Sequence, residues 1–445
     1  MIPAAVAGSA AALIAIAILV LGRLDLTRPA VTFGVVWFAF VALAQLRLTR
    51  QESPWPTGFT LLVFAGALVF IAASLLAGGT APARGRISVR RDDYDARRLV
   101  LVALVLVAGG AIGAAYKAHV LGGVPLLSGD ADVLRARAYR AGRSIVPAWS
   151  SMLTNGFYLG MWCTLAALWI RRRDASRRAL AGLLALAGVA FFGVALEASR
   201  NLVLFALAVP GVALYLLVPP ARGRERLVRP LAAVAIVALV VGGGFALRLW
   251  QADTTSTAYL DSELRGQPAM VRPFLPLYIN GVFPLEAEHR LYLQFPAREP
   301  YKLGAYTLLS LPDATFPEGK RSYGSTLTQL MEVGVAGGGL AWNVATYQGR
   351  MWADLGWTGV ILGSLLLGLG FGRLYRWGRS HEGLLAVAVV AYVAYYSGFM
   401  IYDNLLSFTL IGVYDLAAIL VVERYARGDE LVAPVVRLAR RAAPG

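Results

Sequence analysis

The most regular feature of this chain is a series of apolar runs, each close to the length that crosses a bilayer. A helix needs about 20 mostly apolar residues to span the hydrocarbon core. The pattern predicts eleven such helices and leaves no segment that could form a soluble domain of conventional size. The predicted spans cover residues 4–21, 30–46, 57–78, 99–116, 151–170, 180–196, 202–218, 231–247, 353–371, 384–401 and 405–422.

Two polar stretches interrupt this pattern. The shorter covers residues 117–149, and the longer covers residues 250–352, which is too polar to cross a membrane. Within the longer one, residues 271–296 contain several prolines and a glycine, which argue against a clean span and favour short helices at the membrane surface. We therefore expect a single all-α polytopic membrane domain, residues 1–445, with one large loop.

Composition agrees with this class. The chain is 58% hydrophobic with a mean hydropathy of +0.62, which is far too apolar for a soluble protein of 445 residues. The first run lacks a preceding basic segment, and its charges follow it at Arg23 and Arg28, so we interpret it as a retained span rather than a signal peptide.

The basic residues predict the orientation. Arginines cluster in short loops around residues 84–98, 171–178, 222–229 and 373–379 and in the C-terminal tail. Basic residues concentrate on the cytoplasmic side, so the N-terminus is expected outside, and residues 117–149 and 250–352 are expected on the external face. The net charge of +16 is explained by topology and by anionic headgroups, and we expect the bilayer rather than nucleic acid as the partner.

Several chemistries are disfavoured. The single cysteine, Cys163, lies in an apolar run, and the three histidines form no metal-binding pair. A nucleotide-binding loop of the P-loop type is missing, so a substrate on the external face would have to arrive already activated, most simply on a lipid. We predict no metal and no cofactor, although Asp130 with Asp132 leaves Mg²⁺ open.

The first external loop carries candidate anion-binding residues. Arg137 and Arg140 follow one another at helical spacing, with Arg135 beside them. Guanidinium groups suit a diphosphate, while a solvated helix capped by Asp130 and Asp132 is the alternative reading.

A second candidate is the Ser-Arg-Asn sequence at residues 199–201, between two apolar runs. Arg200 is our strongest single candidate, because an arginine at the mouth of a membrane bundle is a functional residue by default. Glu197, three residues earlier, could instead be its structural partner.

A third region mixes hydrogen-bonding groups with aromatic rings, which suits sugars, although an interfacial aromatic belt is the alternative. The candidate glycan-binding residues there are Tyr323, Trp342, Asn343, Thr346, Tyr347, Gln348 and Arg350. Asp354 follows them at the start of a predicted span and is either a helix-capping charge or a base.

Together these segments resemble the oligosaccharide repeat unit polymerases, the Wzy-type O-antigen polymerase family. The residues that carry the resemblance are Gly-Val-Pro-Leu-Leu at 123–127, Ser-Arg-Asn at 199–201, and Asn343-x-x-Thr346 with Asp354-Leu-Gly-Trp-x-Gly. The resemblance implies a GT-C-like bundle in the bacterial plasma membrane that joins undecaprenyl-diphosphate-linked donor and acceptor repeat units for a surface polysaccharide. It also suggests a chain-length regulator as a partner.

The chemistry implied by this resemblance assigns roles to the candidates. Arg200, Arg135, Arg137 and Arg140 would neutralise the departing diphosphate, and Asp130, Asp132 or Asp354 would serve as the base. Two alternatives remain open. One is an O-antigen ligase-like transferase with a different acceptor, and the other is a transporter or flippase of polyisoprenoid-linked glycans.

Overall fold

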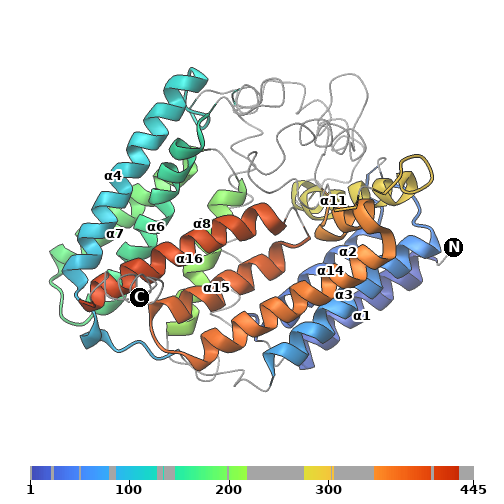
Figure 1. The fold of residues 1–445 in the computed structure, drawn as a ribbon, viewed down its shortest axis with the longest axis horizontal. Helices are drawn as coiled ribbons and strands as arrows, with labels where there is room; N and C mark the ends of the chain where they lie inside the picture. The colour runs from blue at the N-terminus through green and yellow to red at the C-terminus, as the bar shows by residue number, and fades with distance from the viewer. Residues whose placement is uncertain are drawn as a thin grey trace, which may run out of the picture. The chain divides into compact units, whose positions relative to one another are not determined.

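The computed structural model describes residues 3–21, 25–49, 52–79, 87–127, 134, 146–197, 200–217, 275–301, 303–304, 345–401 and 405–429. Within these ranges, all long regular elements are helices (Figure 1). Six of them are long and apolar enough to cross a membrane, and three shorter helices are also apolar. The described part of the chain is therefore all-α, as predicted, with several helices suited to a membrane.

Each predicted span except one coincides with a helix. The exception, residues 231–247, lies outside the described residues. The contact pattern divides the chain into two compact units. Unit 1 comprises residues 1–85, 234–380 and 390–411, and unit 2 comprises residues 86–233, 381–389 and 412–445.

Unit 1 is built on α1 (Ala4–Leu21), α2 (Pro29–Ala44), α3 (Thr57–Gly78) and α14 (Tyr347–Ser380). These helices pack side by side, and α3 and α14 form the most extensive contact among them (Figure 1). Small residues allow it, because a Cβ atom added at Gly368 of α14 would lie 2.5 Å from the backbone oxygen of Phe70 on α3. Such close approach is typical of helix pairs in membranes.

Helix α14 differs from the predicted span 353–371 at its beginning. It starts at Tyr347 and contains a kink at Gly356, whose φ of 59° and ψ of −140° are not helical. Glycine suits this position, because its φ is positive and a Cβ atom at Gly356 would lie 2.6 Å from the hydroxyl oxygen of Tyr301. Residues 347–355 therefore form a separate short segment before the apolar part of the helix.

Helix α11 (Leu275–Gln294) also differs from the prediction, which expected several short surface helices. It is one 20-residue helix with Pro284 inside, and it contacts α2 and α14. Phe283, Leu285 and Leu291 are fully buried, so packing offsets the backbone hydrogen bond that Pro284 removes.

Unit 2 contains α4 (Ala96–Leu121), α6 (Ala148–Arg171), α7 (Arg177–Ala195) and α8 (Arg200–Leu217). Helices α4 and α6 have the closest contact, where Gly113 lies so near α6 that an added Cβ atom would be 2.7 Å from the Ser150 backbone oxygen. The beginning of α15 (Leu384–Phe399) and the end of α16 (Leu405–Arg427) also belong to unit 2.

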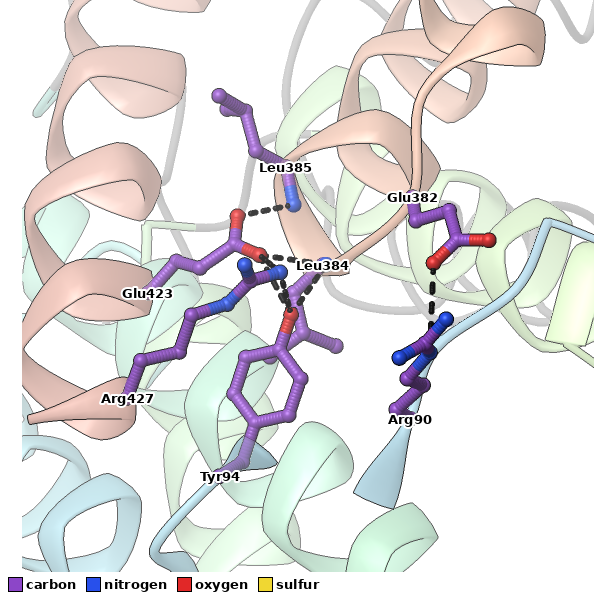
Figure 2. A network of polar contacts seen from close by, with 7 residues as sticks. All are labelled: Arg90, Tyr94, Glu382, Leu384, Leu385, Glu423 and Arg427. Atoms are coloured by element: carbon purple, nitrogen blue, oxygen red, sulfur yellow. Dashed lines mark hydrogen bonds and ion pairs between the residues drawn. The ribbon is translucent and has the colours of Figure 1, made fainter. Parts of the chain in front are cut away.

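A network of hydrogen bonds and ion pairs connects the residues before α4, the start of α15 and the end of α16 (Figure 2). Glu423 of α16 accepts hydrogen bonds from the backbone N–H groups of Leu384 and Leu385 at 3.2 and 2.8 Å, so it caps the start of α15. Tyr94, just before α4, donates its hydroxyl proton to the same carboxylate, and Arg427 bonds Glu423 at 2.6 Å. The Arg90–Glu382 pair, at 3.7 Å, is exposed.

Candidate functional site

The predicted site residues fall into two groups. Asp130, Asp132, Arg135, Arg137, Arg140, Tyr323, Trp342 and Asn343 lie outside the described residues. The structure places Arg200 as the first residue of α8, and its side chain is likewise outside the described part. Thr346, Tyr347, Gln348, Arg350 and Asp354 are described, and all of them lie in unit 1.

In unit 2, the turn that leads into Arg200 is held by a lysine that the sequence reasoning did not select. Lys117, near the end of α4, donates hydrogen bonds from Nζ to Thr154 Oγ1 at 2.9 Å and to Glu197 Oε1 at 2.8 Å. The side chains of Lys117 and Glu197 are 14% and 26% exposed, so this ion pair is mostly shielded from water. The carboxylate three residues before Arg200 is thus bound by Lys117.

The same turn contacts the start of the first polar loop. Helix α4 ends at Gly122, whose φ of 76° is the left-handed conformation that glycine favours at helix ends. The chain then folds back, and the backbone N–H of Leu126 donates to the backbone oxygen of Leu196 at 3.3 Å. Residues 123–127, which carry part of the family resemblance, therefore contact the turn at Leu196 and Glu197 that precedes the Ser-Arg-Asn sequence at 199–201.

In unit 1, Thr346 of the third segment and the two residues after it are buried. Thr346 and Gln348 have no exposed surface, and Tyr347 is 3% exposed. The backbone N–H of Gln348 donates to Thr346 Oγ1 at 3.2 Å, and Gln348 Nε2 donates to the Tyr347 hydroxyl at 3.1 Å. These three side chains belong to the interior of unit 1 in this arrangement, and their role toward a glycan remains a prediction.

The partner of Thr346 is Glu288 on α11. Thr346 Oγ1 donates a short hydrogen bond to Glu288 Oε2, while Glu288 Oε1 has no hydrogen-bond partner among the described residues. Helix α11 is not among the candidate spans. Burial raises the pKa of the fully enclosed Glu288 carboxyl to about 8, against the opposing effect of the Thr346 hydrogen bond. The carboxyl group is therefore mostly neutral at pH 7.

A second acidic group, Glu52, lies in the loop between α2 and α3, and this loop also contacts α11. Glu52 accepts a short hydrogen bond from the Tyr278 hydroxyl and one from Thr49 N at 3.0 Å. Burial raises the pKa of Glu52, while the bonds from Tyr278 and Thr49 act in the opposite direction. The loop is thus joined to α11 through a partly buried carboxylate.

One residue further along this loop, Ser53 donates from Oγ to Glu286 Oε1 at 2.8 Å. The same hydroxyl lies 3.2 Å from Nδ1 of His289. Because the hydroxyl proton is directed to the carboxylate, Nδ1 is the donor in the second contact, and His289 stacks on Phe59 with ring centroids 4.8 Å apart. Three ionisable side chains of α11, Glu286, Glu288 and His289, are thus buried.

Asp354 and Arg350 lie on the short first segment of α14. Asp354 is 1% exposed, two residues before the kink, and its backbone oxygen accepts a hydrogen bond from Leu303 N at 3.0 Å. Nearby, Trp352 contacts Tyr292 and Trp357, with centroids 4.8 and 6.5 Å away, and Trp357 is 42% exposed. The kink therefore separates a buried carboxylate from an accessible aromatic ring.

The sequence analysis did not select Glu288 or Lys117, although the sequence contains an unusual feature at each position. Helix α11 places Glu286, Glu288 and His289 within four residues of an apolar stretch, which is costly unless the groups are paired or neutral. Lys117 is one of only three lysines in a chain with 42 basic residues. Among the described residues, no group of three or more His, Cys, Asp or Glu side chains is arranged to hold a metal ion.

The contacts within each unit join loops that the predicted topology puts on the same face. Leu48 and Ser53 bond to α11, and Leu126 bonds to Leu196, all in segments that the alternation of the predicted spans puts outside. Tyr94 meets Leu384 and Glu423, which are expected inside. Comparison of the chain with protein-family models, curated proteins and solved structures found no match, so these contacts and the sequence are what any assignment of function rests on.

Proposed function

We propose that this chain is a membrane glycosyltransferase that polymerises undecaprenyl-diphosphate-linked oligosaccharide repeat units at the outer face of the bacterial plasma membrane. The proposal includes eleven spans in a GT-C-like bundle, with residues 117–149 and 250–352 on the external side. It rests on the family resemblance of the sequence and on contacts that are compatible with it.

The observation that supports it most directly is the contact between the first polar loop and the turn before Arg200. The Leu126–Leu196 hydrogen bond and the Lys117–Glu197 ion pair hold these segments together at one end of α4, α6 and α7. The proposed diphosphate-binding residues begin at Arg135 in the loop and at Arg200 after the turn. The chain leaves this contact toward Arg135 on one side and toward Arg200 on the other, as a shared anion site requires.

The proposed reaction is a substitution at the sugar carbon bonded to the diphosphate. The acceptor hydroxyl oxygen forms a bond to that carbon, the carbon–oxygen bond to the diphosphate breaks, and the hydroxyl proton passes to a carboxylate. Arginine side chains stabilise the negative charge that builds up on the departing diphosphate. Asp130, Asp132 and Asp354 are the proposed bases, and the exposed Trp357 near Asp354 would offer a face for sugar stacking.

The experiment that tests this function uses the purified protein with a lipid-linked repeat unit. Longer glycan on the same lipid supports the polymerase. Transfer of the glycan to a different acceptor would identify a ligase, and passage of the unchanged lipid across a vesicle bilayer would identify a flippase. Either of the last two outcomes would contradict the polymerase proposal and assign the ligase or flippase function instead.

The central residue is tested by Arg200→Lys, which keeps the charge but loses the two-pronged guanidinium. Losing a charge-assisted contact of about 3 kcal/mol slows turnover on the order of a hundredfold. The matched control is Arg173→Lys, an exposed arginine in a loop expected inside, and it should polymerise normally. Undiminished polymerisation by correctly inserted Arg200→Ala protein removes Arg200 from the site.

A further inference from the structure

Two arginines of unit 2 lie against the same buried tryptophan. The guanidinium carbon of Arg172 lies 3.5 Å from the ring centroid of Trp169, and that of Arg91 lies 5.1 Å from it. Trp169, in the last turn of α6, is 3% exposed. Arg172 follows α6 directly, and Arg91 begins a short 3-10 helix, Arg91–Asp93, before α4. We call Arg91, Trp169 and Arg172 the Trp169 cluster.

The ring of Trp169 holds both cations in place without neutralising them. An indole face attracts a cation through its quadrupole but carries no net charge, so both guanidinium groups stay positive. Because both lie against one ring, the two groups also repel each other. Arg91 and Arg172 are half-buried, which reduces screening by water and still leaves part of each residue accessible. An anion that bonds to both guanidinium groups offsets this repulsion.

The surrounding segments contain too few carboxylates to neutralise their arginines. The described segments of unit 2 that are expected inside contain eleven arginines and seven carboxylates, and they are residues 87–98, 171–178, 381–383 and 423–429. Four arginines therefore remain in excess even when every one of these carboxylates pairs with an arginine. A surplus of arginine at the ends of membrane helices attracts anionic headgroups.

Helix α4 adds an apolar surface beside this charge. Arg97, in its first turn, is exposed. Leu101, Leu104 and Val105 follow it on the same face at helical spacing and are 54%, 50% and 64% exposed. A phospholipid can place its phosphate at the arginines and its acyl chains along such side chains, whereas a free inorganic anion gains nothing from them. The apolar face therefore favours a lipid headgroup as the anion.

We propose that the Trp169 cluster binds the phosphate group of an anionic phospholipid, with the acyl chains beside the exposed face of α4. A guanidinium group presents two parallel N–H donors to phosphate oxygens, so two such groups on one ring can clamp a single phosphate. Arg91 and Arg172 make the contact, and Trp169 is a positioning residue. The inference does not depend on the proposed glycosyltransferase activity, because it concerns helix ends that are expected on the opposite face.

The test measures the Kd of phosphatidylglycerol for the purified full-length protein in a neutral detergent, by native mass spectrometry of the lipid-bound species. We expect Arg91→Gln and Arg172→Gln each to raise the Kd about tenfold, because each removes a charge-assisted contact with the phosphate. Arg91→Lys keeps the charge but loses the paired donors, and it should raise the Kd about threefold. The matched control is Arg178→Gln, which removes an exposed arginine in the first turn of α7 and should change the Kd less than about twofold.

Thermal unfolding with and without the lipid separates binding from packing. Phosphatidylglycerol should raise the Tm of the wild-type protein, because a ligand that binds only the folded state stabilises it. A loss of packing against Trp169 lowers the Tm equally with and without the lipid. The increase in Tm caused by the lipid should therefore be largely lost in Arg91→Gln protein, whatever the Tm of this variant without lipid.

Several results overturn the inference. An unchanged Kd and a full Tm increase in Arg91→Gln and Arg172→Gln proteins would mean that the cluster only packs. An equal rise of the Kd in Arg178→Gln protein would mean that the arginines attract headgroups without a defined site. If inorganic phosphate raises the wild-type Tm as much as phosphatidylglycerol does, the ligand is a free anion and not a lipid. A wild-type protein that does not bind phosphatidylglycerol also contradicts the proposal.

Discussion

Glu288→Gln should remove the pH dependence of the free energy with which α11 opens from the rest of unit 1. The neutral Glu288 carboxyl accepts a hydrogen bond from Thr346 in a site without exposed surface. Glutamine has nearly the same shape as a neutral carboxyl group, so the substitution is expected to preserve this contact while removing the ionisation.

The magnitude follows from the pKa of Glu288 in its buried site, about 8, compared with its ordinary value of 4.5. The folded protein then binds more protons than the unfolded chain at any pH between these values, so stability falls as the pH rises through this window. Ionisation of the buried group therefore lowers the free energy of unfolding by about 4 kcal/mol between about pH 5 and about pH 9. Below the lower value, Glu288 is neutral in both states and the penalty vanishes.

Hydrogen exchange measures this locally. Protection factors of the α11 amides, corrected for the intrinsic effect of pH, report the free energy with which this helix opens. In wild-type protein, the protection of α11 should fall steeply toward about pH 9, and in Glu288→Gln protein it should remain nearly constant. Glu286→Gln is the matched control, because it removes a neighbouring carboxylate of α11 and leaves Glu288 in place.

The reasoning is refuted if wild-type and Glu288→Gln proteins show the same fall in α11 protection as the pH rises. Equal curves would mean that Glu288 is already ionised at low pH in the folded protein, or that its charge is compensated. A loss of protection at all pH values in the variant, in turn, would mean that Gln cannot take the place of the neutral acid beside Thr346.

Two further predictions concern topology and the network of unit 2. In a Cys163→Ala background, a cysteine at the exposed Ala297 should react with an impermeant thiol reagent in intact cells. A cysteine at the exposed Asp174 should react only after lysis. The reverse result would mean that the protein has the opposite orientation in the membrane. Glu423→Ala should destabilise unit 2 by about 3 kcal/mol in thermal or denaturant unfolding, because it removes the acceptor of the Leu385 N–H and the carboxylate partner of Arg427, while the Leu384 N–H keeps the Tyr94 hydroxyl. Glu382→Ala, which breaks the exposed pair with Arg90, should change stability by less than about 1 kcal/mol, and equal effects of the two substitutions would contradict the assigned role of Glu423.

The apolar spans were predictable because their cause is local. In helices such as α1 and α3, a continuous apolar run of span length has no competing structure, since backbone groups in lipid must be bonded within the segment. The prediction gave the bounds of both helices as the structure has them. At α14 it failed at the beginning, because the helix starts at Tyr347, before the apolar run, and contacts α11, which is distant in sequence.

The candidate site was less predictable because its contacts are not local. The structure bonds Glu197 to Lys117, which is 80 residues away, and spacing along the chain does not link residues so far apart. The burial of Glu288 could not be read from a segment whose prolines suggested short surface helices. Only the packing of α11 against α14 shows that Thr346 and Glu288 meet.

The network around Glu423 has a consequence for the order in which the protein matures. Tyr94 and Glu423 are 329 residues apart, so Tyr94 acquires this partner only after 329 further residues have been synthesised. Until α16 is inserted, the first N–H groups of α15 and the hydroxyl of Tyr94 lack the carboxylate that bonds them. A chain truncated before α16 therefore lacks the carboxylate that accepts hydrogen bonds from the Leu385 N–H group and the Tyr94 hydroxyl.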